Sequence, residues 1–343
     1  MKSSTYIQTH IVQKGETLES VADQLGISAE ALKRYHNTYC DLKNLIGKDI
    51  GGIYEIMIPP PEEIAEFKET QKHTEISKNL PSLYLTKSFY ASNYQAIESF
   101  EQLGKEHFTI DYSVFVHLRE TADKGFVVEV ETSDFKKNGQ SSDDKISSLS
   151  LACMESISPI AFTSPAQGKI TGLYDHKTII KRFETQRSYL ENLFIGKTSQ
   201  AYFNKFHSNL IDEKYLLKKF HSALLYQVLF PEMDWFHRKK EWEENFYLVS
   251  GSFPVKVRFH TEYDFENPND TRIVIKGKTE ESGSLEGLLR KIKLETLPEE
   301  KTIGEIELCY TIDKKNKQLQ KAEVSIVLLS EEIPYLKHRL FLQ

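Results

Sequence analysis

Side chains able to do acid–base chemistry are spread along the 343 residues without a common catalytic motif. The sequence has no Gly-rich phosphate loop, Cys-x-x-Cys pair, His-Glu-x-x-His or Gly-x-Ser-x-Gly. Glu155, Asp175 and Glu184 are candidates for cleaving a glycosidic bond, a reaction that needs two carboxyl groups flanking that bond. Sequence does not give the separation of carboxyl groups, and the chain has 50 acidic residues, so we predict no catalytic residue.

Histidine and cysteine side chains are the other candidates for chemistry. His36 and Cys40 stand four apart, a spacing that would place two metal ligands on one helix face. No further ligand pair lies near them, so we predict neither a metal site nor a cofactor. His207 and His221 each follow a phenylalanine, and we interpret them as edge residues of amphipathic helices rather than catalytic bases.

An aromatic cluster at residues 233–242 contains both tryptophans of the chain beside a basic triplet, Arg238 to Lys240. One interpretation is a recognition loop for a protein or a sugar, because Trp and Arg are enriched at binding hot spots. The other is that Trp235 and Phe236 anchor a helical segment to a sheet, and we favour it.

The N-terminal residues have the pattern of a strand followed by a helix with both ends specified. Residues 10–13 are β-prone, and Gly15 supplies a turn. Thr17 stands at a helix N-cap position, and Gly26 stands where a glycine ends a helix. Between them, apolar residues at helical spacing form one face: Leu18, Val21, Ala22 and Leu25.

A second helix and a second strand follow. Ser28 is the expected N-cap, residues 31–35 carry the next apolar stripe, and Asn37 is the expected left-handed terminator. Residues 53–58 alternate in part and then meet three prolines at 59–61, which end a strand because proline lacks a ladder N–H. The predicted order is strand, helix, helix, strand.

This order of elements resembles that of the LysM family. The residues that carry the resemblance are 10–18, Val21-Ala22, Asn37 and Ile58-Pro59. The resemblance implies a shallow groove that binds N-acetylglucosamine-containing glycans, such as peptidoglycan, through backbone groups and apolar side chains. The candidate glycan-binding residues lie in two loops: Gly15, Glu16, Thr17 and Leu18, and Asn44, Leu45, Ile46 and Gly47. The segment 38–52 is longer than the usual loop, and the alternative is that Gly15, Thr17 and Leu18 are only turn, cap and core.

Composition limits the other partners. A net charge of -6 without a basic stripe gives no reason to expect nucleic acid. Three widely spaced cysteines fit a reducing compartment. Without an apolar leader or a membrane-length run, we expect a chain that is cytoplasmic as synthesised. LysM-like proteins of this kind resemble parts of phage-tail-like contractile injection machines, which implies a non-classical, machine-dependent export route and neighbouring machine subunits as partners.

We predict an α+β chain: a LysM-like module at 6–60, a linker at 61–82 and an antiparallel β-rich domain, sheet or half-barrel, at 83–343. Strong alternation predicts hairpins at 108–131 and 306–328, and a helical insertion at about 178–230 interrupts the strands. Thr178 and Asp212 are the expected N-cap residues of two helices in this insertion. The order is loosely similar to that of lipoprotein-carrier-like half-barrels, without a shared motif.

Two functions from different classes follow. The first is a non-enzymatic binding or adaptor protein, in which the module engages glycan or a neighbouring subunit and the β-rich domain supplies an assembly interface. The second is a peptidoglycan-targeted enzyme or toxin whose C-terminal domain acts on the cell wall. Paired carboxylates, or a nucleophile and base with shifted pKa values in a cleft, would favour the second.

Overall fold

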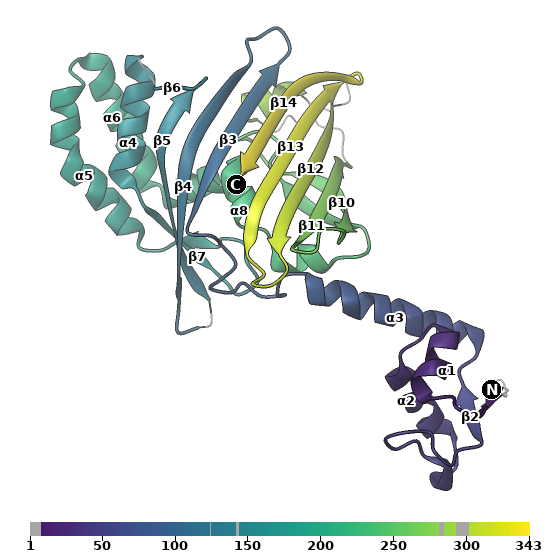
Figure 1. The fold of residues 1–343 in the computed structure, drawn as a ribbon. Coiled ribbons are helices and arrows are strands. Elements are labelled where there is room, and N and C mark those ends of the chain that lie inside the picture. The colour runs from purple at the N-terminus through teal and green to yellow at the C-terminus, as the bar shows by residue number, and fades with distance from the viewer. Residues whose placement is uncertain (1–7, 124, 142–143, 281–284, 293–301) are drawn as a thin grey trace. The chain divides into compact units, whose positions relative to one another are not determined.

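A computed structural model describes residues 8–123, 125–141, 144–280, 285–292 and 302–343, with backbone alone at 69–76 (Figure 1). The start of the predicted module and Lys124 in the first predicted hairpin lie outside the described residues. The chain divides into two compact units, Met1–Asn79 and Leu80–Gln343. Within the described residues, none of the helices combines the length and the apolar character that crossing a membrane requires.

The N-terminal unit has the predicted strand–helix–helix–strand order. Strand β1 (Gln8–Ile11) pairs antiparallel with β2 (Glu55–Ile58), and helices α1 (Leu18–Leu25) and α2 (Ala29–Tyr39) lie between them in sequence. A short 3-10 helix, η1 (Leu42–Asn44), follows α2. The helix starts are confirmed as well, because the Thr17 and Ser28 hydroxyls accept N–H bonds from the first turns of α1 and α2.

Two details of this unit differ from the sequence-based expectation. Helix α2 continues past Asn37 to Tyr39, because the Asn37 side chain bonds the following loop instead of ending the helix. The predicted linker contains a 19-residue helix, α3 (Pro61–Asn79). Its residues Ile64 and Phe67 pack against the core of the N-terminal unit, and that burial favours a helix longer than the turn or more that a linker of this composition indicated.

The C-terminal unit is built on one 12-stranded sheet, and the strand pairs in it are antiparallel (Figure 1). Its strand order is β8-β7-β5-β4-β3-β14-β13-β12-β11-β10-β9, with β6 beside β5. The bounds are β3 Asn93–Gln102, β4 Phe108–Glu120, β5 Phe126–Lys137, β6 Gln140–Ser141, β7 Ile160–Ser164, β8 Gly172–Leu173, β9 Trp242–Phe246, β10 Val255–Asp264, β11 Asp270–Thr279, β12 Thr302–Asp313, β13 Leu319–Ser330 and β14 Ile333–Leu342. The α+β class and both predicted hairpins, β4–β5 and β12–β13, are confirmed.

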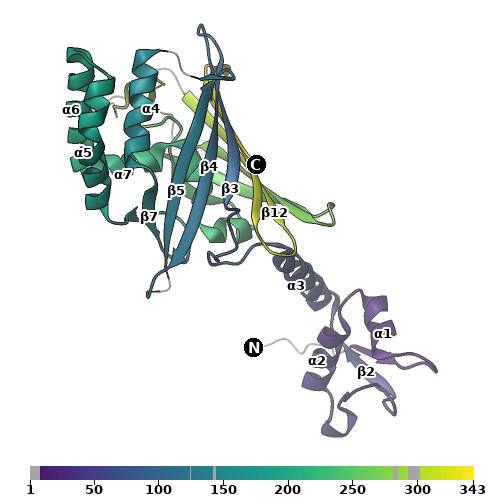
Figure 2. The same cartoon turned by 60° about the vertical axis from the view of Figure 1, so that its left-hand side comes forward.

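Helices α4, α5 and α6 of this unit lie beside β5 and β7, as Figure 2 shows. The bounds are α4 Lys145–Ile157, α5 His176–Leu193, α6 Lys197–Ile211, α7 Glu213–Ser222, α8 Leu224–Leu229, η2 Met233–His237 and α9 Leu285–Arg290. Asp212 caps α7 as expected, whereas Asp175 rather than Thr178 caps α5. Helix α6 lies within the predicted helical insertion at 178–230, although its own bounds were not predicted, and α4 was not expected from the sequence.

The aromatic cluster at 233–242 anchors η2 to the sheet. Trp235 stacks on Phe259 of β10 with ring centroids 6.2 Å apart, and Phe236 meets Tyr310 of β12 edge-on at 5.0 Å. Both Trp235 and Phe236 are buried, so neither ring is available to a partner. Arg238 bonds Asp234 of the same segment instead. The anchoring interpretation is therefore confirmed over the recognition loop.

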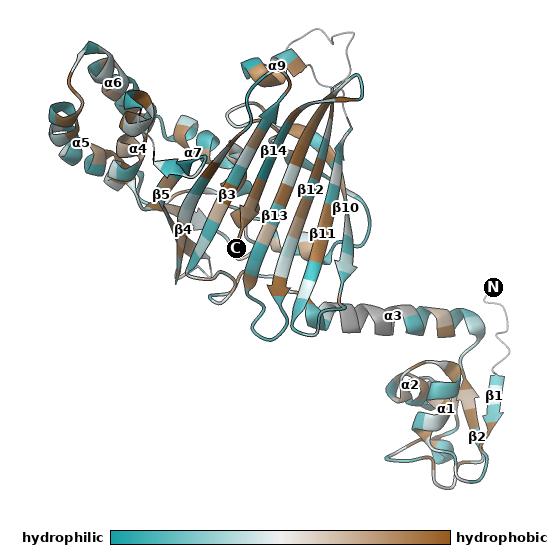
Figure 3. Cartoon of the chain, turned by 45° about the horizontal axis from the view of Figure 1, so that its top comes forward, coloured by the Kyte–Doolittle hydropathy of each residue, from teal (hydrophilic) through white to brown (hydrophobic). Residues whose placement is uncertain are grey.

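Alternating apolar and polar side chains run along the strands, as Figure 3 shows for β10 to β14. Gly277 of β11 lies directly opposite Phe259 of β10, and the Phe259 ring covers the glycine backbone. A Cβ at Gly277 would lie 2.7 Å from Cγ1 of Val257 and closer still to the buried Phe259 ring. Glycine is required here by close packing rather than by its backbone angles.

We expect Gly277→Ala to lower the free energy of unfolding of the C-terminal unit by about 1–3 kcal/mol, because the added methyl group overpacks the core. Thermal and denaturant unfolding of the full chain measure the change. Lys278→Ala is the matched control on the same strand, since Lys278 is exposed and its ion pair with Glu305 lies at the surface. Equal stability of the two variants would contradict this packing account.

Candidate functional site

The loop between β1 and α1 is exposed, and hydrogen bonds of Glu16 hold its shape. Gly15 adopts a φ of +94°, and its surroundings leave open space above the backbone. The Glu16 carboxylate accepts the backbone N–H of Gln13 at 2.7 Å and lies 2.9 Å from Nε2 of His10. The Gln13 N–H and then the His10 contact lower the pKa of Glu16 below its ordinary value. A charged Glu16 therefore holds this turn, which presents the backbone of Gly15.

The next two candidate residues have structural tasks. The hydroxyl of Thr17 accepts the N–H of Ser20 at 3.2 Å, and the Ser20 hydroxyl accepts the N–H of Thr17 in return, which completes a capping box. Leu18 is 7% exposed and belongs to the core of the unit. Thr17 is exposed, so this loop offers a ligand its backbone and the Thr17 surface rather than the Leu18 side chain.

The second loop is pinned to α2 at three points. The Asn37 side chain donates to the C=O of Ile46 at 3.1 Å and accepts the Ile46 N–H at 2.8 Å. Nε2 of His36 bonds the C=O of Asn44 at 2.7 Å. Nζ of Lys33 donates to the C=O of Gly47 at 2.6 Å. A loop longer than the usual LysM loop is thus fixed by side chains of the preceding helix.

His36 is a structural residue and not a metal ligand. Its Nδ1 accepts the backbone N–H of Met57 at 3.0 Å, so Nε2 carries the proton that bonds Asn44. The side chain is fully buried, and both ring nitrogens are used to join α2, the second loop and β2. The 36–40 pair therefore offers a metal no free imidazole nitrogen.

The two candidate loops flank one core. Leu18 from the first loop and Ile46 from the second belong to the same cluster of buried side chains. Between Asn44 and Gly47 the apolar side chain left at the surface is Leu45, which is 46% exposed. The eight-residue glycan site stays a prediction, with Gly15, Thr17 and Leu45 as the members placed to contact a ligand.

Sequence reasoning missed two exposed apolar residues near these loops. Leu42 is 87% exposed in η1, and Tyr54 is 74% exposed just before β2. Leu42 lies in the long segment between the second predicted helix and the second predicted strand, and Tyr54 lies in the partly alternating residues 53–58. Neither position has a signal in the sequence that separates it from other singly exposed apolar residues, which are common at protein surfaces.

The carboxyl groups suggested for glycan cleavage are spread over three separate settings. Asp175 caps α5 and bonds Thr178, which lowers the pKa of Asp175. Glu184 lies 3.1 Å from Nε2 of His207 on the helix surface. Glu155 is exposed and lines a hollow of about 300 Å³ beside Arg182. An acid catalyst needs a raised pKa, and the shift at Asp175 runs the other way.

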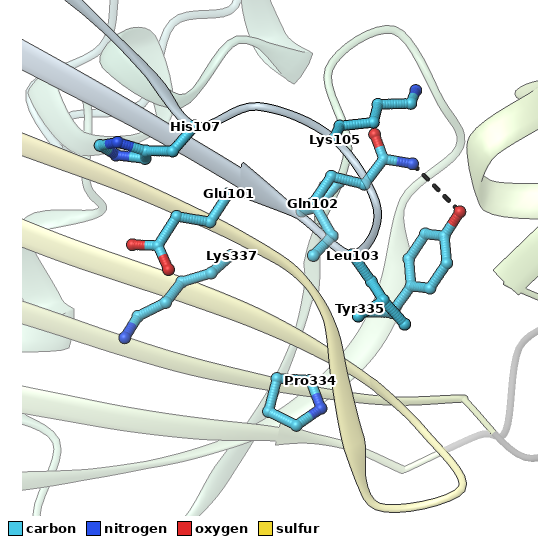
Figure 4. A pocket seen from close by; sticks show the side chains of 9 residues that line it. Glu101, Gln102, Leu103, Lys105, His107, Pro334, Tyr335 and Lys337 are labelled. Carbon is cyan, nitrogen blue, oxygen red and sulfur yellow. Dashed lines mark hydrogen bonds between the residues drawn. The ribbon is translucent and has the colours of Figure 1, made fainter.

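A larger hollow of about 570 Å³ lies where the turn after β3 meets the start of β14 (Figure 4). Nε2 of Gln102 donates to the Tyr335 hydroxyl at 3.0 Å across it. Glu101 and Lys337 are opposite each other on β3 and β14, and Glu101 also lies 3.5 Å from Arg339. The Glu101 carboxylate is thus engaged in a surface ion pair with Arg339, and no nucleophile and base converge among these residues.

We expect Asn37→Ala to loosen the second loop, because it removes both bonds to Ile46 and leaves that backbone partly unpaired. The expected loss is about 1–3 kcal/mol in local stability, seen as faster amide hydrogen exchange across residues 44–47 of the full chain. Thr38→Ala is the matched control on the same helix, since its hydroxyl bonds only Arg34 of α2. Unchanged exchange in Asn37→Ala would contradict the pinning.

Comparison with known proteins separates the two units. No curated protein matches the chain. Among solved structures, lipovitellin, from a study of its lipid–protein interactions, is 8% identical with a TM-score of 0.38 over 74% of this chain and 25% of its own. A LolA superfamily protein from Nitrosomonas europaea is 5% identical with a TM-score of 0.22, over 80% of this chain and 90% of its own. This chain thus spans a quarter of the lipovitellin chain, and neither likeness establishes the fold of the C-terminal unit.

The N-terminal unit does match a family. Residues 10–42 fit the family model of the LysM domain, and this match covers the end of the first strand, both helices and the capping residues Thr17 and Ser28. That match indicates binding of peptidoglycan or a related N-acetylglucosamine glycan. The C-terminal unit matches no family model. The N-terminal unit of this chain thus contains a segment, residues 10–42, that matches the LysM domain and is called the LysM domain below.

Proposed function

We propose that this chain is a non-enzymatic binding or adaptor protein whose LysM domain binds peptidoglycan through the Gly15–Leu18 and Asn44–Gly47 loops. The observation that carries the proposal is the pinning of the second loop by Asn37, with Leu45 left exposed beside the buried Ile46. A loop that is already held in place loses little conformational entropy on binding, so ordering it adds little to the free-energy cost of binding.

The two loops would divide the recognition of one sugar. The exposed backbone at Gly15 has space for a ligand to approach and can hydrogen-bond an acetamido group. The apolar Leu45 side chain would cover the C–H face of a sugar ring, which is the apolar part of a glycan. Leu18 and Ile46 would support these contacts from the core below and would not touch the sugar.

The adaptor part of the proposal assigns the C-terminal unit an assembly role. Asp175 and Glu184 are engaged in a helix cap and a surface pair, which is why we favour an adaptor over a wall-cutting enzyme or toxin. We further propose that the assembly is a phage-tail-like injection machine, with the chain made in the cytoplasm and carried out by that machine. This last step rests on the resemblance stated for the sequence.

We expect Leu45→Ala to weaken binding of the full chain to insoluble peptidoglycan roughly fivefold, since a lost apolar contact of about 1 kcal/mol gives that factor. Co-sedimentation at increasing protein concentration measures the change. Ile195→Ala is the matched control, because Ile195 is an exposed apolar residue of the C-terminal unit, at 76%. The variant also needs an unchanged unfolding temperature.

The proposal fails if the wild-type chain does not sediment with peptidoglycan, or if both variants bind as the wild type does. The first result would indicate that the LysM domain binds a protein partner instead of peptidoglycan. The second would move the glycan site away from the second loop, with the exposed side chains of Leu42 and Tyr54 as the next positions to test.

A further inference from the structure

The C-terminal unit contains an open groove of about 620 Å³ between its sheet and its helices. Strands β4 and β5 form one wall, and helices α4, α6, α7 and α8 form the other. The volume lies within the range of about 300–1,000 Å³ that is usual for small-molecule sites. It is larger than the hollow of about 570 Å³ beside the start of β14, and it does not involve the LysM domain.

Apolar side chains line the groove without being fully covered. Ile110 of β4, Phe135 of β5, Leu151 of α4 and Phe206 of α6 are half-buried, and Met154 of α4 is 38% exposed. Four separate elements thus direct apolar groups into one space. Leaving such a surface in water is unfavourable, and contiguous exposed apolar surface marks a binding site more often than chance exposure does.

The floor of the groove has one carboxylate, and that carboxylate is already satisfied. The Tyr112 hydroxyl donates to Oε1 of Glu98 at 2.5 Å, and Nε2 of His338 lies 2.8 Å from Oε2. Burial raises the pKa of Tyr112, so its hydroxyl keeps the proton it donates. Both Glu98 oxygens are therefore occupied, and Glu98 is not placed to pair with a cation brought by a ligand.

Positive charge surrounds the same groove. Lys136 and Lys137 of β5 and Lys219 of α7 line it. Lys291, which follows α9, approaches Lys219 next to the lining residue Ser250: a Cβ at Gly251 would lie 2.9 Å from Nζ of Lys219 and 3.1 Å from Nζ of Lys291. Among the described residues, no carboxylate pairs with either of these two ammonium groups. Nζ of Lys219 also lies over the Tyr215 ring, 5.2 Å from its centroid, and this contact leaves its charge uncompensated. Two ammonium groups without a described carboxylate partner at one point favour an anion there.

We propose that this groove binds a single-chain anionic amphiphile, a fatty acid. Its acyl chain lies against Phe135, Leu151 and Met154, and its carboxylate sits at Lys219 and Lys291. The commitment to an anion rests on charge complementarity, because no described carboxylate pairs with Lys219 or Lys291 while both oxygens of Glu98 are occupied. This site is independent of glycan binding and goes beyond the proposed function.

The test uses the full chain and cis-parinaric acid, a fatty acid whose fluorescence rises in apolar surroundings. The wild type should bind it with saturation. Met154→Trp, which fills the groove from a partly exposed position, should weaken binding at least tenfold. The double variant Lys219→Gln/Lys291→Asn should weaken it about tenfold, while Lys321→Gln, an exposed lysine on β13, should leave it unchanged. Asn suits position 291, where φ is +64°.

The methyl ester of the same acid tests the headgroup. The wild type should bind the ester about tenfold more weakly than the acid, and the double lysine variant should bind both equally. Met154→Glu replaces Met154→Trp if the tryptophan variant has a lowered unfolding temperature. No fluorescence rise with the wild type, or unchanged binding in a folded groove variant, overturns the site. Equal wild-type affinity for acid and ester overturns the anionic occupant in favour of a neutral lipid.

Discussion

The pairing of β3 with β14 is the constraint on which the C-terminal unit depends. Seven residue pairs, from Ala96 opposite Leu342 to Gln102 opposite Leu336, join the first and last strands of the unit in the middle of its sheet. Without these pairs, β3–β8 and β9–β14 would be two smaller sheets, each with a new unpaired edge. The same pairing brings Glu98 and His338 together at the floor of the apolar groove, so the sheet and the groove have one origin.

In the LysM domain, a few side chains hold an irregular segment in place. Its second loop is too long to be fixed by backbone turns alone, and adjacent residues of α2, His36 and Asn37, supply the missing bonds. Both side chains are used inward, toward Asn44, Ile46 and β2. The surface that remains above them is Leu45 and open backbone, which is the surface a glycan would need.

The parts that could be predicted were local in sequence. The helix starts at Thr17 and Ser28 could be predicted from a few neighbouring residues. The two long hairpins could be predicted in the same way, from alternation within each strand. The β3–β14 pairing could not be predicted, because it joins segments some 240 residues apart that carry no mutual signal. For the predicted glycan site, helical spacing already offered Leu18 as a core residue, but sequence could not tell that Ile46 faces the core as well, since burial there depends on the whole unit.

Binding of a glycan between the two loops of the LysM domain is the central claim, and a titration of the full chain with an N-acetylglucosamine tetramer tests it directly. Backbone amide NMR shifts report each loop separately. The account predicts saturable shifts concentrated at residues 15–18 and 44–47, with small changes at the buried His36 and in the C-terminal unit. Shifts that are absent at high tetramer concentration, or that concentrate outside these loops, would contradict it.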